Sequence, residues 1–452
     1  MKRLLFCDLI DWSNSPMRKP LILRGARQVG KTHVVRELGK KFENFVEINF
    51  EKEPKLTEIF EYNLDPDRIV RELSFTLNVQ IIPGKTLLFF DEAQEAPQSI
   101  IALRYFYEEM PKLHVIAAGS LIDFAIEKVG VPVGRVSFLY MYPMSFIEYL
   151  YASGYRMLAI EIVEHKAHEK ISEVIHDKIL RLLREYCAIG GLPEVVAQWL
   201  TQEENQTCAG VLEDIKNAYM QDFAKYARQH EIKYVELLFK QVPSLIAQSF
   251  KYSHLSTDYR KRELEPSLYL LEKAGILHAI THSAGNGFPL GAEANFKKFK
   301  LILFDIGLCQ NILGLGPQDW FFDAKSVFVN KGQIIENFVG QELLAYSDSE
   351  SKSHLYYWSR EVKNSQAEVD YLTTYNNTII PVEVKSGHGA GLQSMRRFLE
   401  SHPSSPYGIR FSVHDYSVFD SIHSYPLYAV AGTIEEENKK RLLRFLQNNA
   451  DE

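Results

Sequence analysis

The sequence predicts an α/β protein with three successive parts: a parallel-sheet unit, a largely helical middle and a second α/β unit. In the first third, short apolar runs alternate with amphipathic stretches, the pattern of parallel strands joined by helices. From about Ile171 to Ala274 apolar residues recur at helical spacing, and from about Ser326 helix and strand patterns alternate again. These changes of pattern divide the chain into expected units at residues 1–205, 206–325 and 326–452.

The N-terminal unit is expected to contain short strands, most of them rich in β-branched, leucine or aromatic residues. They are Pro20–Arg24, Phe45–Phe50, Thr86–Phe90, His114–Ala118 and Arg135–Tyr140. Amphipathic stretches at Thr32–Lys41 and Ser99–Glu109 predict helices between them.

A phosphate-binding loop follows the first expected strand. Its residues match the pattern G-x-x-x-x-G-K-T and are Gly25, Ala26, Arg27, Gln28, Val29, Gly30, Lys31 and Thr32. Glycines let the backbone amides curl around the β- and γ-phosphates of a nucleotide, at the positive end of the following helix. Lys31 would neutralise phosphate charge, and Thr32 would offer its hydroxyl to Mg²⁺. The motif therefore predicts binding of ATP with magnesium.

A second part of the nucleotide site is expected where the strand Thr86–Phe90 ends. Asp91 and Glu92 follow this strand directly. Asp91 is suited to hold Mg²⁺ through its water shell, and Glu92 to orient and deprotonate the attacking water. Two carboxylates after an apolar strand also fit an ordinary turn, but together with the phosphate-binding loop they favour ATP hydrolysis.

Two more polar residues are candidates for the γ-phosphate. Ser120 follows the strand His114–Ala118 and would reach the phosphate or the water, although Gly119-Ser120 is also common turn chemistry. Arg135 is a candidate transition-state arginine, acting in its own chain or on a neighbouring subunit of a homo-oligomer. A solvated surface arginine is the alternative interpretation of Arg135.

Together these motifs resemble the AAA-like ATPase family whose members are fused to a DUF4143 region. The matching segments are GARQVGKT, LLFFDEAQ, AAGS, GR…YPMSFIEYL and IGGLPEVV, in family order over about residues 18–200. The resemblance implies a P-loop core with an additional strand, followed by a small helical lid. The helical patterns from Ile171 onward fit such a lid.

The middle of the chain suggests a winged helix, in which helices are followed by a hairpin. The expected elements are helices Lys233–Ser249 and Glu265–Ala274 and strands Gly275–Ile280 and Lys298–Phe304. Basic runs at residues 259–262 and 296–300 would contact DNA phosphates. Acidic neighbours dilute this charge, so a connector with a solvated lysine face stays open beside DNA binding. Proteins similar in their DUF4143 region carry a winged-helix-like segment here, which supports the fold more than the ligand.

Three carboxylates and a lysine gather in the C-terminal unit. Glu336 lies on an expected helix, and Asp370 lies in a strand that a turn at residues 376–377 connects to the next. That next strand carries Glu383 and Lys385 on one face, because side chains alternate along a strand. A hairpin would bring Asp370 beside Glu383.

This set suits metal-assisted phosphodiester hydrolysis. Asp370, Glu383 and Glu336 would bind Mg²⁺ through hard oxygen ligands, and Lys385 would orient the water or stabilise developing charge. Residues 330–430 resemble the PD-(D/E)xK nuclease superfamily, although Val369 stands where that motif has its proline. A Glu-x-Lys strand is also frequent as an exposed ion pair, and a nuclease-like fold does not imply cleavage.

Composition and charge bound the remaining possibilities. The 452 residues are 46% hydrophobic and 24% charged, as in globular proteins, and the net charge of −7 leaves only local basic surfaces for nucleic acid. The cysteines, Cys7, Cys187, Cys208 and Cys309, are too dispersed for a disulfide framework or zinc cluster, which favours a reducing compartment. Asp8 interrupts the N-terminal apolar stretch, and no uncharged stretch approaches ~20 residues, so a cytoplasmic protein without membrane contact is expected.

The sequence thus predicts an ATPase whose nucleotide state controls a winged-helix and nuclease-like half that acts on DNA. Lys31 and Glu92 would serve ATP hydrolysis, and Asp370, Glu383 and Lys385 would serve DNA cleavage. The alternative is a regulatory ATP switch whose inactive nuclease-like domain is a binding scaffold for nucleic acid or protein.

Overall fold

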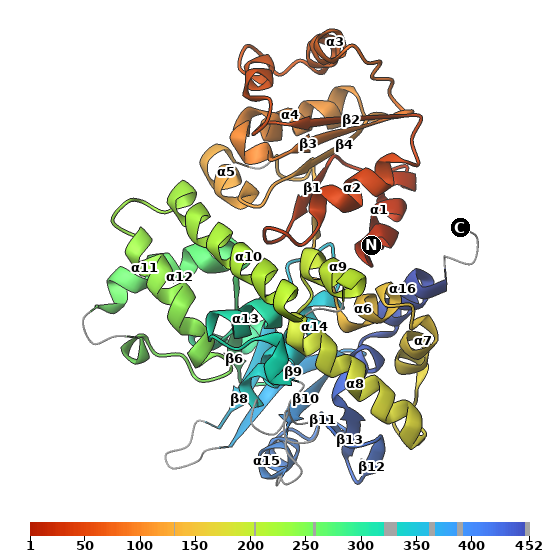
Figure 1. Ribbon diagram of the computed structural model, residues 1–452, viewed down its shortest axis with the longest axis vertical. Coiled ribbons are helices and arrows are strands. Elements are labelled where there is room, and N and C mark those ends of the chain that lie inside the picture. Colours follow the sequence, from red (N-terminus) through yellow and green to blue (C-terminus); the bar gives the residue numbers. More distant parts are fainter. Residues whose placement is uncertain are drawn as a thin grey trace.

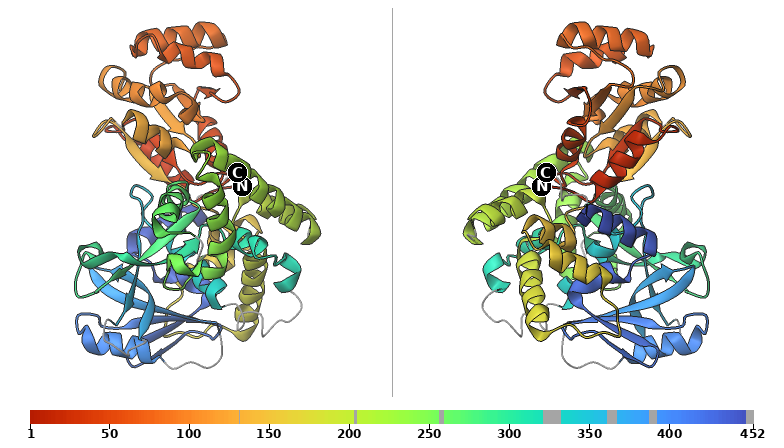
Figure 2. Two further views of the ribbon diagram at one scale, coloured as in Figure 1. Left: turned by 90° about the vertical axis from the view of Figure 1, so that its left-hand side faces the viewer. Right: turned by 90° about the vertical axis from the view of Figure 1, so that its right-hand side faces the viewer.

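The computed structural model has one sheet at each end of the molecule, with helices between them (Figure 1). The residues that it describes are 1–130, 132–202, 205–255, 259–320, 332–360, 367–386 and 392–447. In the side views of Figure 2, the N-terminal sheet and its helices form the upper part and the C-terminal sheet forms the lower part. Within the described segments, no helix combines the length and apolar character needed to cross a bilayer.

The N-terminal sheet is parallel, with strand order β2-β3-β4-β1-β5. Its strands are β1 (Leu21–Arg24), β2 (Asn44–Asn49), β3 (Thr86–Asp91), β4 (His114–Ala118) and β5 (Ser137–Tyr140). Strand β4 lies between β1, which leads into the phosphate-binding loop, and β3, which ends at Asp91. This is the additional strand that the resemblance implied, and the predicted P-loop fold is confirmed.

Helices cover both faces of this sheet, because the central strands are apolar on both sides. The helices are α1 (Leu5–Asn14), α2 (Lys31–Gly39), α3 (Pro66–Leu77), α4 (Pro97–Glu109) and α5 (Ile122–Val129). Along β3, Leu88 and Phe90 belong to the core formed with α3, α4 and α5. Leu87 and Phe89 belong to the opposite core, which includes α1 and α2 and continues without a break into the rest of the chain.

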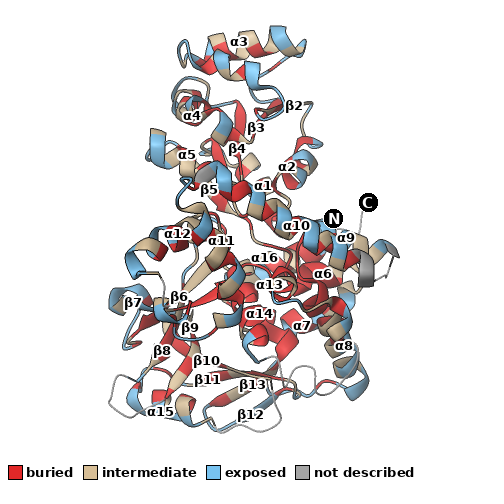
Figure 3. Cartoon of the chain, turned by 60° about the vertical axis from the view of Figure 1, so that its left-hand side comes forward, coloured by how far each residue is buried: buried red, intermediate tan, exposed pale blue. Residues whose placement is uncertain are grey.

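The middle of the chain is helical, as its periodicity predicts. The helices are α6 (Phe146–Ala152), α7 (Arg156–Glu164), α8 (Glu173–Ile189), α9 (Pro193–Gln202), α10 (Asn205–Tyr226), α11 (Ile232–Gln241), α12 (Lys261–Lys273) and α13 (Ile306–Ile312). Buried residues are concentrated in the strands and in the helices between the two sheets (Figure 3).

The C-terminal sheet is mixed, with strand order β12-β13-β11-β10-β9-β8-β6-β7. Its strands are β6 (Leu277–Ser283), β7 (Ala294–Leu303), β8 (Leu355–Ser359), β9 (Glu368–Tyr375), β10 (Thr378–Lys385), β11 (Gly408–Ser412), β12 (Ser417–Phe419) and β13 (Ile422–Pro426). Helices α14 (Gly332–Ala345) and α15 (Gln393–Ser401) pack against it, and α16 (Glu436–Gln447) returns to α1 and α7. The predicted C-terminal α/β architecture is therefore present.

The hairpin predicted as a wing has a different place. Strand β6 pairs with β7 on one side and in parallel with β8 on the other, where Ile280 lies opposite Leu355. Most residues of β6 are buried, and a projecting wing would expose them to water. The hairpin is the edge of the C-terminal sheet rather than a separate wing, and the winged-helix interpretation of the helices before it stays a prediction. The unit limit expected at 325/326 separates β6 from β8, and the domain limits stay a prediction.

Candidate functional site

The phosphate-binding loop connects β1 to α2, and its backbone requires glycine. Gly25 and Gly30 have φ values of +148° and +98°, and a Cβ at Gly25 would lie 2.2 Å from the carbonyl oxygen of Met141. In the described structure, no side chain caps the amides at Gly30, where α2 begins. These amides therefore remain available to an anion at the helix N-terminus.

Lys31 lies within the curve of this loop. Its ammonium donates hydrogen bonds to the carbonyl oxygens of Gly25 and Ala26, both at 2.8 Å. Burial lowers the pKa of Lys31 to about 8, although Glu92 and Asp91 act in the opposite direction. The loop thus holds a cation where a phosphate would enter.

Asp91 is joined to the loop by hydrogen bonds. The Thr32 hydroxyl donates to both carboxylate oxygens of Asp91 at 3.2 Å, and the Asn49 amide donates to Oδ2 at 3.1 Å. Burial, followed by the neighbouring Glu92, raises the pKa of Asp91. A hydroxyl and a carboxylate that converge in this way are hard oxygen ligands and fit a hydrated Mg²⁺ shared with nucleotide phosphates.

Glu92 has a partner that the sequence analysis did not single out. Its backbone is left-handed, with φ of +51°, and its Oε2 accepts a hydrogen bond of 2.6 Å from the Gln94 side chain. Gln94 in turn lies against Gly119 at the end of β4, where a Cβ would meet its Oε1 at 1.9 Å. Ser120 follows Gly119 and is thereby at the same edge of the sheet as Glu92. The signal for Gln94 in the sequence was its place in LLFFDEAQ.

Arg135 lies at the opposite edge. Leu21 pairs with Ser137 and Arg24 with Tyr140, so Arg135 precedes β5 while the loop follows β1. At about 3.3 Å per residue, this separates Arg135 from the loop by about 20 Å. Its guanidinium instead pairs with Glu108 at 3.1 Å. The prediction that Arg135 acts in its own chain is wrong, and action on a neighbouring subunit stays a prediction.

The predicted C-terminal hairpin is present and brings Asp370 beside Glu383. Tyr371 pairs with Val382, which makes Asp370 and Glu383 the next cross-strand neighbours, and the Val384 amide donates to Asp370 at 2.7 Å. Lys385 pairs with Glu383 at 2.5 Å. Burial raises the pKa of Glu383, and its Oε2 is buried without a hydrogen-bond partner in the described structure.

A second lysine occupies the middle of these carboxylates. The ammonium of Lys300, on β7, lies 2.6 Å from Glu368, 3.1 Å from Glu336 and 3.9 Å from Asp370. The side chain of Lys300 is 0% exposed. The expectation that this lysine contacts DNA phosphates with its neighbours is therefore wrong.

The C-terminal residues fit a divalent metal poorly. Glu336 and Asp370 face the Lys300 ammonium, and a divalent ion would have to enter against that charge. Among the described residues, no group of three or more His, Cys, Asp and Glu side chains could hold a metal ion. No cleavage step through a metal at Asp370, Glu383 and Glu336 follows from this geometry.

Models of known protein families match both the N-terminal and the C-terminal part of the chain. Residues 17–150 match the model of an AAA domain (AAA_14), and residues 331–430 match a domain of unknown function, DUF4143. The chain contains an AAA domain and a DUF4143 region. Between them, residues 180–319 match another domain of unknown function, DUF8612. No curated protein matches the sequence.

Two solved structures are similar to the chain at low identity. The Walker-type ATPase PABY2304 of Pyrococcus abyssi has 14% identity and a TM-score of 0.43, with 68% of this chain and 94% of that chain covered. The ORC2 protein of Aeropyrum pernix, in ADPNP–ADP complexes, has 10% identity and a TM-score of 0.33, with 70% and 93% covered. At these TM-scores the similarity assigns neither fold nor function.

The phosphate-binding loop of the AAA domain is covered by α10. Arg27 forms an ion pair with Asp222, and the Tyr219 hydroxyl donates to the Arg27 carbonyl at 2.7 Å. A third contact joins Lys225 to Glu51 at 3.1 Å. These partners are 174 to 195 residues apart in sequence, and no local pattern singles them out.

Two more elements contact the same loop. The buried guanidinium of Arg3 donates to the carbonyl of Val29 and pairs with Glu148 at 2.8 Å. On another side, Gly275 at the end of α12 lies against the backbone of Ala26, where a Cβ would be 3.4 Å from the amide nitrogen. Residues outside the loop therefore contact it on two sides, from the N-terminal segment and from the segment after α12.

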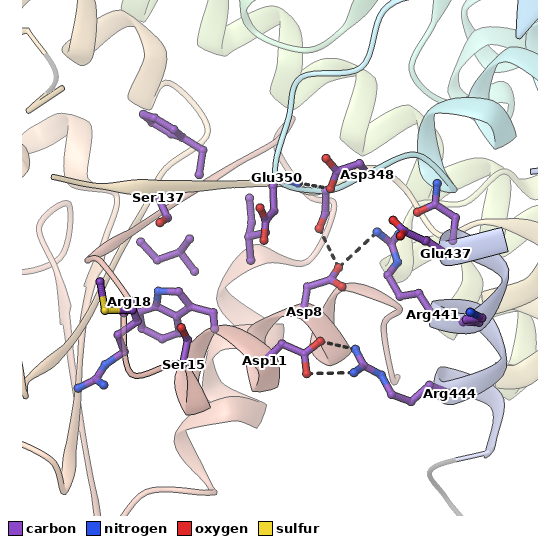
Figure 4. Close-up of a pocket in the computed structure, with 18 residues that line it drawn as sticks. Asp8, Asp11, Ser15, Arg18, Ser137, Asp348, Glu350, Glu437, Arg441 and Arg444 are labelled. Atoms are coloured by element: carbon purple, nitrogen blue, oxygen red, sulfur yellow. Dashed lines mark hydrogen bonds and ion pairs between the residues drawn. The ribbon is translucent and has the colours of Figure 1, made fainter. Parts of the chain in front are cut away.

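Helix α1 also joins the AAA domain to α16. Asp11 and Arg444 form a two-pronged ion pair, and Asp8 faces Arg441 at 3.6 Å while accepting a hydrogen bond from Ser349 (Figure 4). These residues line a cavity of about 840 Å³. Burial raises the pKa of Asp8, and Arg441 acts in the opposite direction. The N-terminal segment thus contacts the phosphate-binding loop through Arg3, which precedes α1, and contacts α16 through α1 itself.

Proposed function

We propose that the AAA domain hydrolyses ATP. The loop amides and Lys31 bind the phosphates, and Thr32 and Asp91 would hold Mg²⁺, which neutralises charge on the β- and γ-phosphates when bound. Glu92 orients the attacking water and accepts its proton. The observation that carries the proposal is the hydrogen bonding of Thr32 in the loop to Asp91, the residue directly before Glu92.

The test is phosphate release by the purified chain with ATP and magnesium. The unaltered chain is expected to turn over ATP, and Lys31→Ala is expected to lose that turnover. Unchanged hydrolysis by Lys31→Ala would mean that the nucleotide site lies elsewhere.

We further propose that the nucleotide state acts on the C-terminal half. Its support is a set of three contacts with the loop. Asp222 of α10 pairs with Arg27, the residue Arg3 before α1 donates to Val29, and Gly275 after α12 lies against Ala26. Hydrogen exchange of α10 with and without a non-hydrolysable ATP analogue tests this. Identical exchange in both states, with the analogue bound, would contradict coupling.

DNA is the partner that we propose for the C-terminal half. Its support is limited to the exposed basic side chains at the start of α12 and on β7, namely Arg260, Lys261, Arg262, Lys297 and Lys298. ATPase assays with and without double-stranded DNA test this proposal, since stimulation would link the two halves. The absence of both stimulation and salt-dependent binding would favour a protein partner instead.

Cleavage of DNA through Asp370, Glu383 and Lys385 stays a prediction from the sequence. Incubation of the chain with plasmid and magnesium tests it, with Lys385→Ala as the comparison. The second candidate, an ATP switch with a non-cleaving scaffold, is favoured by the ion pairs that Lys300 forms with Glu336, Glu368 and Asp370.

A further inference from the structure

The lysines of β7 have different surroundings although they are close in sequence. Lys297 and Lys298 are exposed, whereas the side chain of Lys300 is fully buried. Lys300 lies opposite Ile280 of β6, in the part of the hairpin that is covered by the rest of the sheet. Its ammonium also lies 5.2 Å from the centre of the Tyr357 ring. A lysine in such a place needs compensating charge, because transfer of an ammonium out of water is costly.

That compensation comes from two other elements. Glu336 is on α14, and Glu368 and Asp370 are on β9, where two residues of separation put them on one face. The Lys300 ammonium lies 3.1 Å from Glu336 and 2.6 Å from Glu368, which supplies compensating charge from both elements. These ion pairs tie β7 to α14 and β9.

The contacts with Lys300 also limit the oxygen atoms that these carboxylates can offer to a metal ion. Glu336 has its Oε1 3.1 Å from the Lys300 ammonium, so this oxygen already faces a cation. Asp370 has one oxygen engaged by the Val384 amide and the other facing Lys300. Among the described oxygens of Glu336, Asp370 and Glu383, only Oε2 of Glu383 is buried without a hydrogen bond, whereas a magnesium ion takes about six oxygen ligands.

We propose that Lys300 is the resident cation of this carboxylate cluster, so that its ammonium takes the place of a divalent metal. The C-terminal half then keeps its fold without metal and does not hydrolyse phosphodiesters. Removal of the ammonium leaves a cluster of uncompensated carboxylates, which is the charge pattern that binds a divalent ion. This inference does not depend on ATP hydrolysis.

The test measures Mn²⁺ binding by the nucleotide-free full chain. Electron paramagnetic resonance detects the bound ion, and thermal unfolding reports its effect on stability. All proteins carry Asp91→Asn, which removes the metal ligand of the AAA domain from the measurement. With Lys300 present, we expect no Mn²⁺ bound at the C-terminal carboxylates and no effect of Mn²⁺ on Tm. Lys300→Met is expected to have a lower Tm without metal, to bind one Mn²⁺ per chain, and to regain several degrees of Tm on binding.

Lys297→Met is the matched control, because it removes a lysine from the same strand at an exposed position, and it is expected to behave like the parent. Adding Asp370→Asn to Lys300→Met should abolish the new Mn²⁺ site. Two results would overturn the proposal. In the first, the parent binds Mn²⁺ and the substitution Asp370→Asn abolishes this binding. In the second, Lys300→Met folds but binds no Mn²⁺. The parent comparison decides the matter even if Lys300→Met fails to fold.

Discussion

Replacement of Glu92 by glutamine is expected to slow ATP hydrolysis about 10²- to 10⁴-fold and to leave ATP binding nearly unchanged. At about 1.36 kcal/mol per factor of ten, this raises the barrier by about 2.7–5.4 kcal/mol. Glutamine keeps the shape of the side chain, and its carbonyl oxygen can still accept the 2.6 Å hydrogen bond from Gln94. The proton acceptor is lost, while the phosphate contacts from the loop and Lys31 remain.

Steady-state phosphate release and the Kd of a fluorescent ATP analogue separate the two effects. Glu95→Gln is the matched control, because Glu95 lies on the same short segment with its side chain exposed, and it should leave both quantities unchanged. Gln94→Ala should lower kcat with little change in KM, because it frees Glu92 without removing it. Turnover by Glu92→Gln close to that of the unaltered chain, or ATP binding lost in parallel, would refute the assignment of Glu92 as the base.

Two further predictions concern the surroundings of the loop. Since the pKa of Lys31 is about 8 in the folded chain, ATP binding above that pH must take up a proton, and Kd should rise toward about tenfold per pH unit. In the nucleotide-free chain the pKa of Lys31 is lower in the folded state, about 8, than its ordinary value of 10.5. The contribution of Lys31 to the free energy of unfolding therefore increases as the pH rises from about 8 to about 10.5. Calorimetry tests the first effect, and a Kd that stays constant across this range would contradict it. Asp222→Asn should lower the free energy of unfolding in urea by about 1 kcal/mol. This is less than the loss expected for a buried charged hydrogen bond, because Arg27 is 36% exposed. Asp214→Asn, at an exposed position of the same helix, should leave the free energy of unfolding unchanged.

The parts of the fold predicted from sequence are those decided by local patterns. The strand expected at His114–Ala118 has these bounds in the structure, because a fully apolar run between turn residues has few alternatives. Thr86–Phe90 is extended by one residue to Asp91. The helix expected at Lys233–Ser249 is shorter, since α11 ends at Gln241 and Pro243 lies in the following 3₁₀ turn.

The parts that were missed depend on partners distant in sequence. Strand alternation in the sequence predicts Lys298 and Lys300 on one face of a regular strand, yet only Lys300 is buried, and the register of β7 with β6 shifts between Phe299 and Asn295. What distinguishes them is the position of α14 and β9, which no pattern within β7 records. Asp222 is similar, because a carboxylate on a long polar helix usually faces water, and only the fold brings it to Arg27.

Arg27 belongs to the phosphate-binding loop and also pairs with α10, so nucleotide phosphate and Asp222 would compete for its guanidinium. A nucleotide phosphate that attracts Arg27 weakens its pair with Asp222, and by reciprocity a firmly attached α10 weakens the attraction of Arg27 to phosphate. A ligand shifts an equilibrium only by its difference in affinity for the two states, and a guanidinium shared by phosphate and Asp222 would provide such a difference. Because α10 also packs on α11 and α13, we expect a change at this one pair to extend to these helices.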